Sequence, residues 1–379
     1  MSRVLAAFGR LYRGETTVDY YGKRRIAFSA SVAFTVVSIA VLAFGGLNLG
    51  IDFKGGVAWE VSASSTFGVD EVRAVLDEKG IDTTNAKLQT LQGTEGERVR
   101  AQVGDQPDDV RRDVQTALAD AAGVPVEDVS VAAVSSSWGR SITEKAIRAL
   151  LVFFVLVSLF IAWRFEWKMA LAAIIAMAHD VIISVGIYAI FRFEVTPATV
   201  VAFLTILGYS LYDTVVVYDR VRENIERFAT TRISMGNIIN VSSNQVIARS
   251  LNTTLSSALP VLALLVVGSW IMGATSLEEF AVALLVGMVT GTYSSIFVAT
   301  PLVAVMKDRE PKYAPVANQV ARGAETAKLF EHTTTRAAAK AARVDANTAA
   351  GGSPSSSTAT STHGSVFTHP PRPRKRRRR

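Results

Sequence analysis

Six stretches of the sequence are apolar over lengths that match a membrane-spanning helix, which needs about 20 consecutive apolar residues. They predict helices at residues 26–47, 142–163, 168–191, 195–218, 249–277 and 280–306. The second is long enough only if its helix begins before the apolar run 149–163, with Arg148 reaching the membrane interface. The pattern therefore predicts a polytopic α-helical membrane protein with six transmembrane helices.

The first apolar stretch could be either a signal peptide or a retained membrane anchor. It follows the basic run Lys23-Arg24-Arg25 and contains no charged residue. It is long for the apolar part of a signal peptide, and a glycine-rich segment at 50–56 follows it in place of an Ala-x-Ala cleavage site. We therefore interpret it as an uncleaved anchor.

Residues 50–137, between the first and second predicted helices, have the pattern of a small soluble domain. Short runs rich in valine and leucine predict strands at 57–63, 87–91, 99–103 and 129–134. Apolar stripes predict helices at 69–80 and 107–123, the second with Pro107 in its first turn and Gly123 at its end. The order β-α-β-β-α-β predicts a small α+β domain with the ferredoxin-like, split-βαβ arrangement.

Charged residues predict the orientation of the six helices. Arginine and lysine are frequent in the N-terminal segment 1–25, the connection 219–248 and the tail 307–379, whereas the short connections on the other side carry Arg192 with Glu194, and Glu278 with Glu279. By the positive-inside rule both termini are cytoplasmic and the domain at 50–137 is external. The tail is rich in serine, glycine and proline and ends in an arginine block, which predicts disorder.

Composition narrows the possible functions. The 379 residues are 49% hydrophobic and carry a formal net charge of +7, which we interpret as a topology signal and not as specific nucleic-acid binding. The arginine-rich end could bind ribosomal RNA or anionic lipid, or remain a solvated tail. The chain has no cysteine, so it has no disulfide, thiol nucleophile or thiolate metal site. Without a Walker A motif, nucleophile elbow or zinc-ligand spacing, the sequence predicts no enzyme, metal or cofactor.

An aspartate near the inner end of the fourth stretch is the most informative single residue. Asp213 lies in an apolar run, and an ionisable side chain at a bilayer centre costs about 2.5–3.5 kcal/mol on insertion scales. Arg220 follows two helical turns later on nearly the same face. Asp213 is then either a structural carboxylate paired with an arginine or a proton- or ion-binding group. Intramembrane ionisable residues favour the second interpretation.

Three more ionisable residues are candidates for the same site. Arg249 opens the fifth stretch on the cytoplasmic side, where it is either an interfacial arginine or a group brought close to Asp213. His179 and Asp180 lie in the middle of the third stretch, as either a structural polar pair or part of a relay. These side chains are expected to face other helices, because lipid offers them no partner.

Glycines mark two further features. Gly287 and Gly291 in the sixth stretch have the GxxxG spacing that permits close helix packing. Residues 50–56 predict a tight turn, with glycines at positive φ and Asp52 as a cap. Both interpretations are structural, and neither predicts a binding site.

Four motifs resemble the SecD/SecF family of protein-export membrane proteins, within the resistance-nodulation-division superfamily. They are GIDFKGG at 50–56, AHDV at 178–181, GYSLYDTVVVYDRVREN at 208–224 and RSLNTT at 249–254. Their order and spacing agree with the family across about residues 20–306, and the tail after about 310 lies outside the resemblance. One departure is Tyr212, which stands where asparagine commonly precedes the aspartate.

The resemblance implies an auxiliary subunit of the Sec translocase in the bacterial plasma membrane. Such a subunit pairs with SecD beside SecYEG, contacts membrane lipid and unfolded preprotein, and uses the proton gradient to promote export. It implies that Asp213 and Arg249 belong to the proton pathway, that the coupling ion is H⁺, and that no cofactor is needed.

Two rival functions are also compatible with the sequence. One is a half-transporter of the same superfamily that exports a small molecule or lipid, for which the external domain is small. The other is a membrane scaffold or sensor, which predicts that Asp213, His179 and Arg249 could all be neutralised without loss of function.

Overall fold

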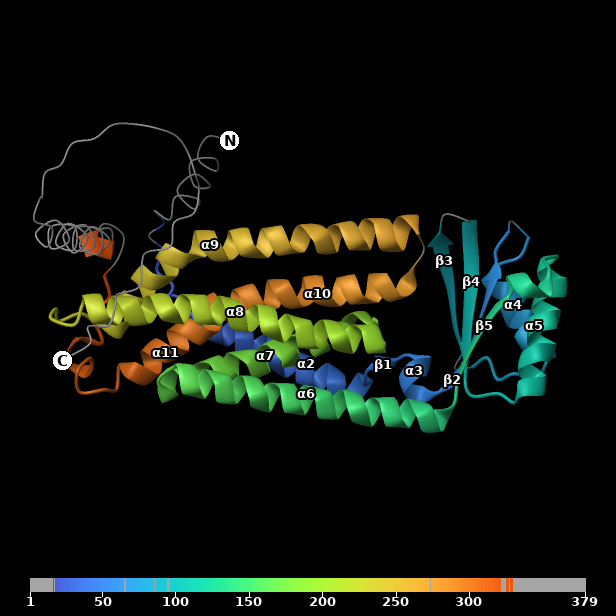
Figure 1. Cartoon of the computed structure of the whole chain (residues 1–379), viewed down its shortest axis with the longest axis horizontal. Coiled ribbons are helices and arrows are strands. Elements are labelled where there is room, and N and C mark those ends of the chain that lie inside the picture. Colours follow the sequence, from blue (N-terminus) through green and yellow to red (C-terminus); the bar gives the residue numbers. More distant parts are fainter. Residues whose placement is uncertain are drawn as a thin grey trace, which may run out of the picture. The chain divides into compact units, whose positions relative to one another are not determined.

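The computed structural model describes residue 16, residues 18–64, 66–84, 86–93, 96–272 and 274–321, and residues 325, 326, 328 and 329. All of these belong to one compact unit, residues 1–333, whose elements are labelled in Figure 1. The predictions made for residues 1–15 and 330–379, including the arginine-rich end, lie outside the described residues.

Among the described residues, six helices are long and apolar enough to cross a membrane, which confirms the predicted number. They are α2 (Arg24–Gly45), α6 (Ser136–Arg164), α7 (Trp167–Phe191), α8 (Pro197–Arg227), α9 (Met235–Ala263) with the π-helical η2 (Leu264–Ile271), and α10 (Thr275–Ser294) with the π-helical η3 (Ser295–Ala299) and α11 (Thr300–Lys307). The second helix begins well before its apolar run, as its length required.

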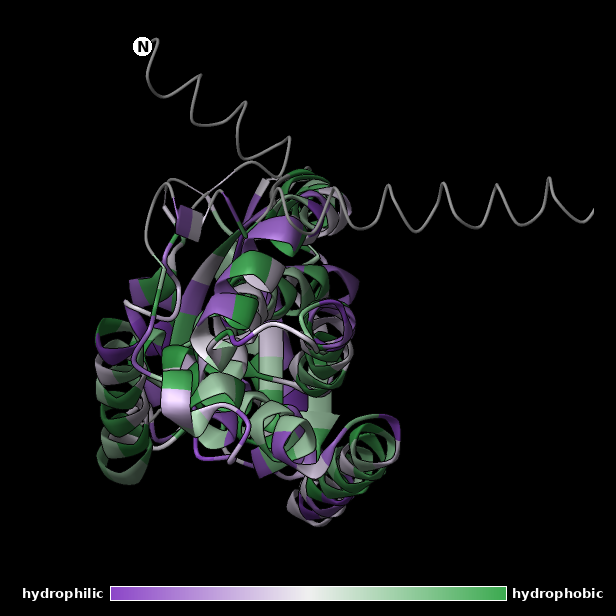
Figure 2. Ribbon diagram, turned by 90° about the vertical axis from the view of Figure 1, so that its left-hand side faces the viewer, coloured by the Kyte–Doolittle hydropathy of each residue, from purple (hydrophilic) through white to green (hydrophobic). Residues whose placement is uncertain are grey.

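The outer surfaces of these helices are largely apolar, and Figure 2, which looks along the helices, shows hydrophobic residues on several of them. Phe34 on α2, Leu151 and Leu159 on α6 and Val266 on η2 are all exposed. Apolar side chains on a surface of this extent are typical of contact with lipid or with another membrane helix. The protein is therefore a multi-pass membrane protein.

The segment predicted as a connection, 219–248, is mostly helical. α8 continues to Arg227, and α9 already begins at Met235, where Ser234 Oγ accepts a hydrogen bond from the Asn237 amide at 3.3 Å. Hydropathy did not predict this part of α9 as a span because its residues are polar, yet most of them are buried.

Three asparagines on one face of α9 account for this burial. Asn240 accepts a hydrogen bond from the Tyr21 amide at 2.8 Å, and Asn244 both accepts from and donates to the Val18 backbone, at 2.9 and 2.8 Å. Asn237 does the same for the segment after α11, donating to the Gln319 carbonyl and accepting from the Ala321 amide. The start of α9 thus fixes two segments that are distant in sequence.

The disorder predicted from residue 307 onward does not begin there. Residues 308–321 form turns and a short 3₁₀ helix, η4 (Ala314–Val316). Tyr313 and Val316 are buried against the helical core, and Lys307 pairs with Glu166 at 2.5 Å. This apolar burial orders a segment whose composition alone predicted disorder.

The insert contains β2 (Gly56–Ser62), α4 (Val69–Glu78), β3 (Lys87–Gly93), β4 (Gly96–Val103), α5 (Asp108–Ala122) and β5 (Ser130–Val134). The strands form one sheet in the order β3-β4-β2-β5, and each neighbouring pair is antiparallel. Val57, Trp59 and Val61 point from β2 into a core shared with α4 and α5, which cover the sheet face turned away from the long helices (Figure 1).

The glycine-rich segment 50–56 is not the predicted tight turn. It forms one helical turn, α3 (Ile51–Lys54), between β1 (Asn48–Leu49) and β2, with Gly50 and not Asp52 at the N-cap position. Gly55 and Gly56 do adopt positive φ, at 79° and 143°. A Cβ on Gly55 would lie 2.6 Å from Ser136 Cα, so the segment packs its backbone directly against the start of α6.

Candidate functional site

Asp213 lies on α8 with its side chain turned toward α9. It is only 6% exposed, and Ser250 Oγ of α9 donates a hydrogen bond to its carboxylate at 2.6 Å. Ser250 is itself buried within α9. The structure thus joins the fourth and fifth spans at Asp213 through a hydroxyl group.

The two arginines predicted as partners of Asp213 bind other residues. Arg249 is exposed, and its Nη2 donates to the hydroxyl of Tyr212 at 3.3 Å. Arg220 donates to Glu223 at 2.5 Å. No ion pair joins either arginine to Asp213 in the part of the chain that the structure describes. Tyr212, the departure from the family pattern, therefore binds the arginine from the position next to Asp213 on α8.

Asp180 forms a second buried carboxylate centre, with hydroxyl groups from two other helices. It is 1% exposed and accepts hydrogen bonds from Ser210 Oγ of α8 at 2.5 Å and from Ser294 Oγ of α10 at 2.7 Å. Its other carboxylate oxygen lies 3.2 Å from Nδ1 of His179. Nε2 of His179 is buried and has no hydrogen-bond partner among the described residues.

The two carboxylates are connected through α8. Ser210, which binds Asp180, comes one helical turn before Asp213, and its carbonyl accepts from Thr214 Oγ1 at 3.0 Å. Thr214 in turn lies 2.9 Å from Ser295 Oγ. A band of hydroxyl groups therefore crosses the helical bundle beside both carboxylates. Chains of hydroxyl and carboxyl groups of this kind can hold and pass protons.

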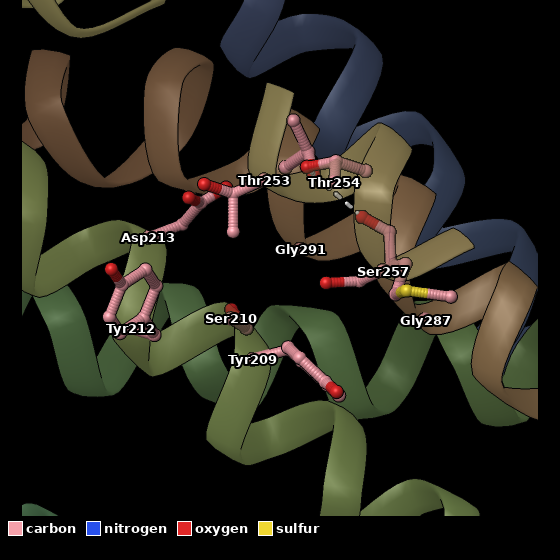
Figure 3. A pocket seen from close by; sticks show the side chains of 11 residues that line it. Tyr209, Ser210, Tyr212, Asp213, Thr253, Thr254, Ser257, Gly287 and Gly291 are labelled. Atoms are coloured by element: carbon pink, nitrogen blue, oxygen red, sulfur yellow. Dashed lines mark hydrogen bonds between the residues drawn. The ribbon is translucent and has the colours of Figure 1, made fainter. Parts of the chain in front are cut away.

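A pocket opens beside Asp213, and Figure 3 shows its lining side chains. Its volume of about 20 Å³ is enough for a water molecule, and its walls come from α8, α9 and α10. The glycine pair of α10 brings that helix close, because a Cβ on Gly291 would lie 2.9 Å from Ser210 Cβ. The predicted GxxxG packing thus forms one wall. The lining residues are Tyr209, Ser210, Tyr212, Asp213, Thr253, Thr254, Ser257, Gly287, Met288, Gly291 and Thr292.

The sequence did not single out Ser210, Ser250 and Ser294 as partners of the carboxylates. Serine in a membrane helix often bonds a carbonyl of its own helix, as Ser256 does with Asn252 at 2.5 Å. One signal in the sequence could have pointed to two of these serines. Ser210 and Ser250 lie within the motifs at 208–224 and 249–254.

These features define a class of protein: a polytopic membrane protein with ionisable groups enclosed between its helices. It has six spans, buried carboxylates in a polar core and a small sheet domain. Comparison with known families refines this. The family described as "Protein export membrane protein SecD/SecF, C-terminal" matches residues 113–309, and the "SecD/SecF GG Motif" matches residues 40–65. The chain belongs to the SecD/SecF family of protein-export membrane proteins.

Individual relatives agree with this assignment. The protein translocase subunit SecF of Streptomyces coelicolor is 40% identical over 324 residues, which cover 84% of this chain and 85% of the relative. That of Vibrio alginolyticus is 33% identical, with 77% and 91% covered. The crystal structure of SecDF from Thermus thermophilus superposes with a TM-score of 0.69 at 32% identity over 78% of this chain. This chain spans 39% of that longer protein.

Proposed function

We propose that this chain is an auxiliary subunit of the Sec protein translocase that uses the proton gradient to promote export of preproteins across the plasma membrane. Family membership supports the translocase role, since relatives alignable over most of the chain are named as translocase subunits. The observation that supports proton coupling is Asp213, a buried carboxylate inside a membrane-spanning helix, beside a pocket and a hydroxyl donor.

In this proposal Asp213 takes up and releases the proton. A buried carboxylate without a counter-charge is costly when ionised, so gain or loss of a proton changes how α8 packs against α9. Arg249, held by Tyr212 at the rim, supplies a positive charge that can approach when α9 moves. Asp180 and His179 form the second part of the relay, linked to α8 through Ser210.

We further propose that SecD covers the outer face of α8 and α9. Tyr209 and Tyr212 are 44% and 47% exposed on this face, beside the exposed Arg249, Asn252 and Ser256. Polar groups of this kind are poorly accommodated by lipid and suit a helix–helix interface. Relatives in which the two proteins form one SecDF chain support this partner. SecYEG, unfolded preprotein and membrane lipid complete the proposed set of partners.

The sheet domain is proposed to be a ferredoxin-like domain on the external side, with both termini cytoplasmic. Its element order and antiparallel strand order β3-β4-β2-β5 support the fold. The basic residues Arg220, Arg222, Arg227 and Arg232, at the far end of the helices, support the orientation.

Export of a pulse-labelled precursor tests the proton role directly. We expect Asp213→Asn to slow export strongly while the protein accumulates in the membrane and still binds SecD. The matched control is Asp219→Asn, at an exposed position on the same helix where the side chain pairs with Arg164 at 3.2 Å. If Asp213→Asn exports at the wild-type rate, Asp213 is structural and the proposed coupling is wrong.

A further inference from the structure

The short connection between α7 and α8 is fixed from several sides. Its strand β6 (Glu194–Val195) pairs in parallel with β1, and the Gly50 amide donates to the Val195 carbonyl at 2.9 Å. Arg192 adopts a left-handed conformation, with φ of 57°, and its Nη1 donates to the Gly45 carbonyl at 2.8 Å. The connection therefore holds the end of α2 and the start of the sheet domain together.

The side chain of Glu194 reaches from this connection to the sheet. It is 9% exposed and forms an ion pair with Lys87 of β3, whose side chain is 27% exposed. Gln102 Nε2 of β4 donates to its other oxygen at 3.2 Å. Lys87 and Gln102 are direct neighbours in the β3–β4 register, so two adjacent strands bind the same carboxylate, that of Glu194.

The same segment leads directly into α8. Thr199 Oγ1 in the first turn donates to the Glu194 carbonyl at 3.4 Å and accepts from the Thr196 amide at 3.2 Å. Thr196 Oγ1 donates to Glu279 of α10 at 2.7 Å. From this first turn, about 24 Å of helix leads to Asp213. The start of α8 is thus bound to the sheet on one side and to α10 on the other.

The contacts of the sheet domain differ between its two sides. At the β2 side the backbone of residues 53–55 packs directly on α6, where a Cβ on Gly139 would lie 2.8 Å from the Phe53 carbonyl oxygen. At the β3 side the contact with Glu194 is polar, and a pocket of about 300 Å³, lined by both Lys87 and Glu194, lies beside it. The close backbone packing at the β2 side suits a pivot, and the polar contact at the β3 side suits a contact that opens and closes.

We propose that Glu194 is the positioning residue that couples α8 to the external sheet domain. Its pairing with Lys87 and Gln102 fastens the sheet to the helix that carries Asp213, and a shift of α8 is transmitted through it, with the packing at Gly55 and Gly139 as the pivot. The proposal rests on the proposed proton-driven function, to which it adds the path from the proton site to the external domain.

Charge reversal of the pair tests the coupling in the full chain assembled with SecD. Lys87→Glu and Glu194→Lys each place like charges together, and the double variant restores a pair with reversed signs. Because the chain has no cysteine, spin labels on Thr90→Cys and Ile190→Cys report the distance between sheet and helices. The control is the Lys79–Asp113 pair at 3.5 Å, which lies entirely within the sheet domain.

We expect each single reversal to broaden the label distance distribution. The ratio of molecules with the sheet bound at Glu194 to those with it released should fall about fivefold, the change in an equilibrium constant that about 1 kcal/mol produces. Export slows in parallel, and the double variant recovers both the narrow distribution and the export rate. Reversal of Lys79 and Asp113, singly or together, leaves both unchanged.

Two outcomes would overturn the coupling role. One is wild-type export in both single variants while Asp213→Asn abolishes it, which leaves the proton function intact. The other is slow export in the double variant despite a restored narrow distribution. If Asp213→Asn also exports normally, the proposed function itself fails, so the two failures are distinguishable.

Discussion

Gly139 gives the sharpest test of how the sheet domain is seated. Its missing side chain lets the first turn of α6 touch the segment 53–55, and an added Cβ would lie 2.8 Å from the Phe53 carbonyl oxygen and 3.0 Å from the Gly55 amide nitrogen. Both neighbours are backbone atoms, so no side chain can rotate away. Overpacking of this kind costs about 1–3 kcal/mol.

Gly139→Ala should therefore lower the free energy of unfolding by about 2 kcal/mol. Thermal unfolding in detergent, followed by tryptophan fluorescence, measures this as a lower midpoint, by about 1–2 °C per kcal/mol, because the unfolding entropy grows with chain length. Trp138, next to the substitution and exposed, is a local reporter.

Gly208→Ala is the matched control. A Cβ at Gly208 in α8 meets no atom within 4 Å, and alanine suits a helix better than glycine by up to about 1 kcal/mol. We expect its midpoint to equal or exceed that of the wild type. Equal midpoints for Gly139→Ala and the wild type would refute the close approach of α3 and α6.

Two further variants probe the polar sites. Ser250→Ala removes the hydroxyl donor of Asp213 and should slow export in the pulse-label assay. Thr35→Val, which removes a hydroxyl that bonds the Ser31 carbonyl of its own helix α2, should not. Equal rates for Ser250→Ala and Thr35→Val would exclude Ser250 from the relay. Burial raises the pKa of the Asp308 carboxyl, and the hydrogen bond from Tyr21 offsets this only in part. The neutral Asp308 carboxyl therefore stabilises the folded protein. This stabilisation is fully present below about pH 4, the pKa of aspartate in the unfolded chain, and is lost as pH rises through the raised pKa of the folded protein. Asp308→Asn should therefore flatten the decline of the unfolding midpoint between pH 4 and 8, and parallel curves would contradict this.

The fold was predictable where burial in lipid requires an apolar sequence. All six spans satisfy that requirement, because a membrane helix exposes its side chains to hydrocarbon. The start of α9 does not, since Asn237, Asn240 and Asn244 are buried by binding the backbone of segments near residues 20 and 320. A polar residue buried by a distant partner has the same local pattern as one exposed to water.

In the site, too, the sequence showed which residues are unusual but not which residues they contact. Asp213 and Asp180 were detectable because a carboxylate in an apolar run is costly without a partner. Their serine partners were not detectable. A serine that bonds its own helix cannot be told from the sequence apart from one that bonds another helix. Arg249 comes directly before Ser250 at this contact between α8 and α9, but its guanidinium binds the Tyr212 hydroxyl, a pairing that the sequence pattern does not reveal.

The asparagine face of α9 also sets an order of events during synthesis. Tyr21 and its hydrogen-bond partner Asn240 are 219 residues apart. At typical elongation rates the second emerges roughly 10–45 s after the first. Until then the N-terminal segment has no binding surface, although the first span is already available for insertion. Closure of this end of the helical bundle is therefore a late step in biogenesis, and truncation before α9 should leave inserted chains in which residues 18–21 are open to protease.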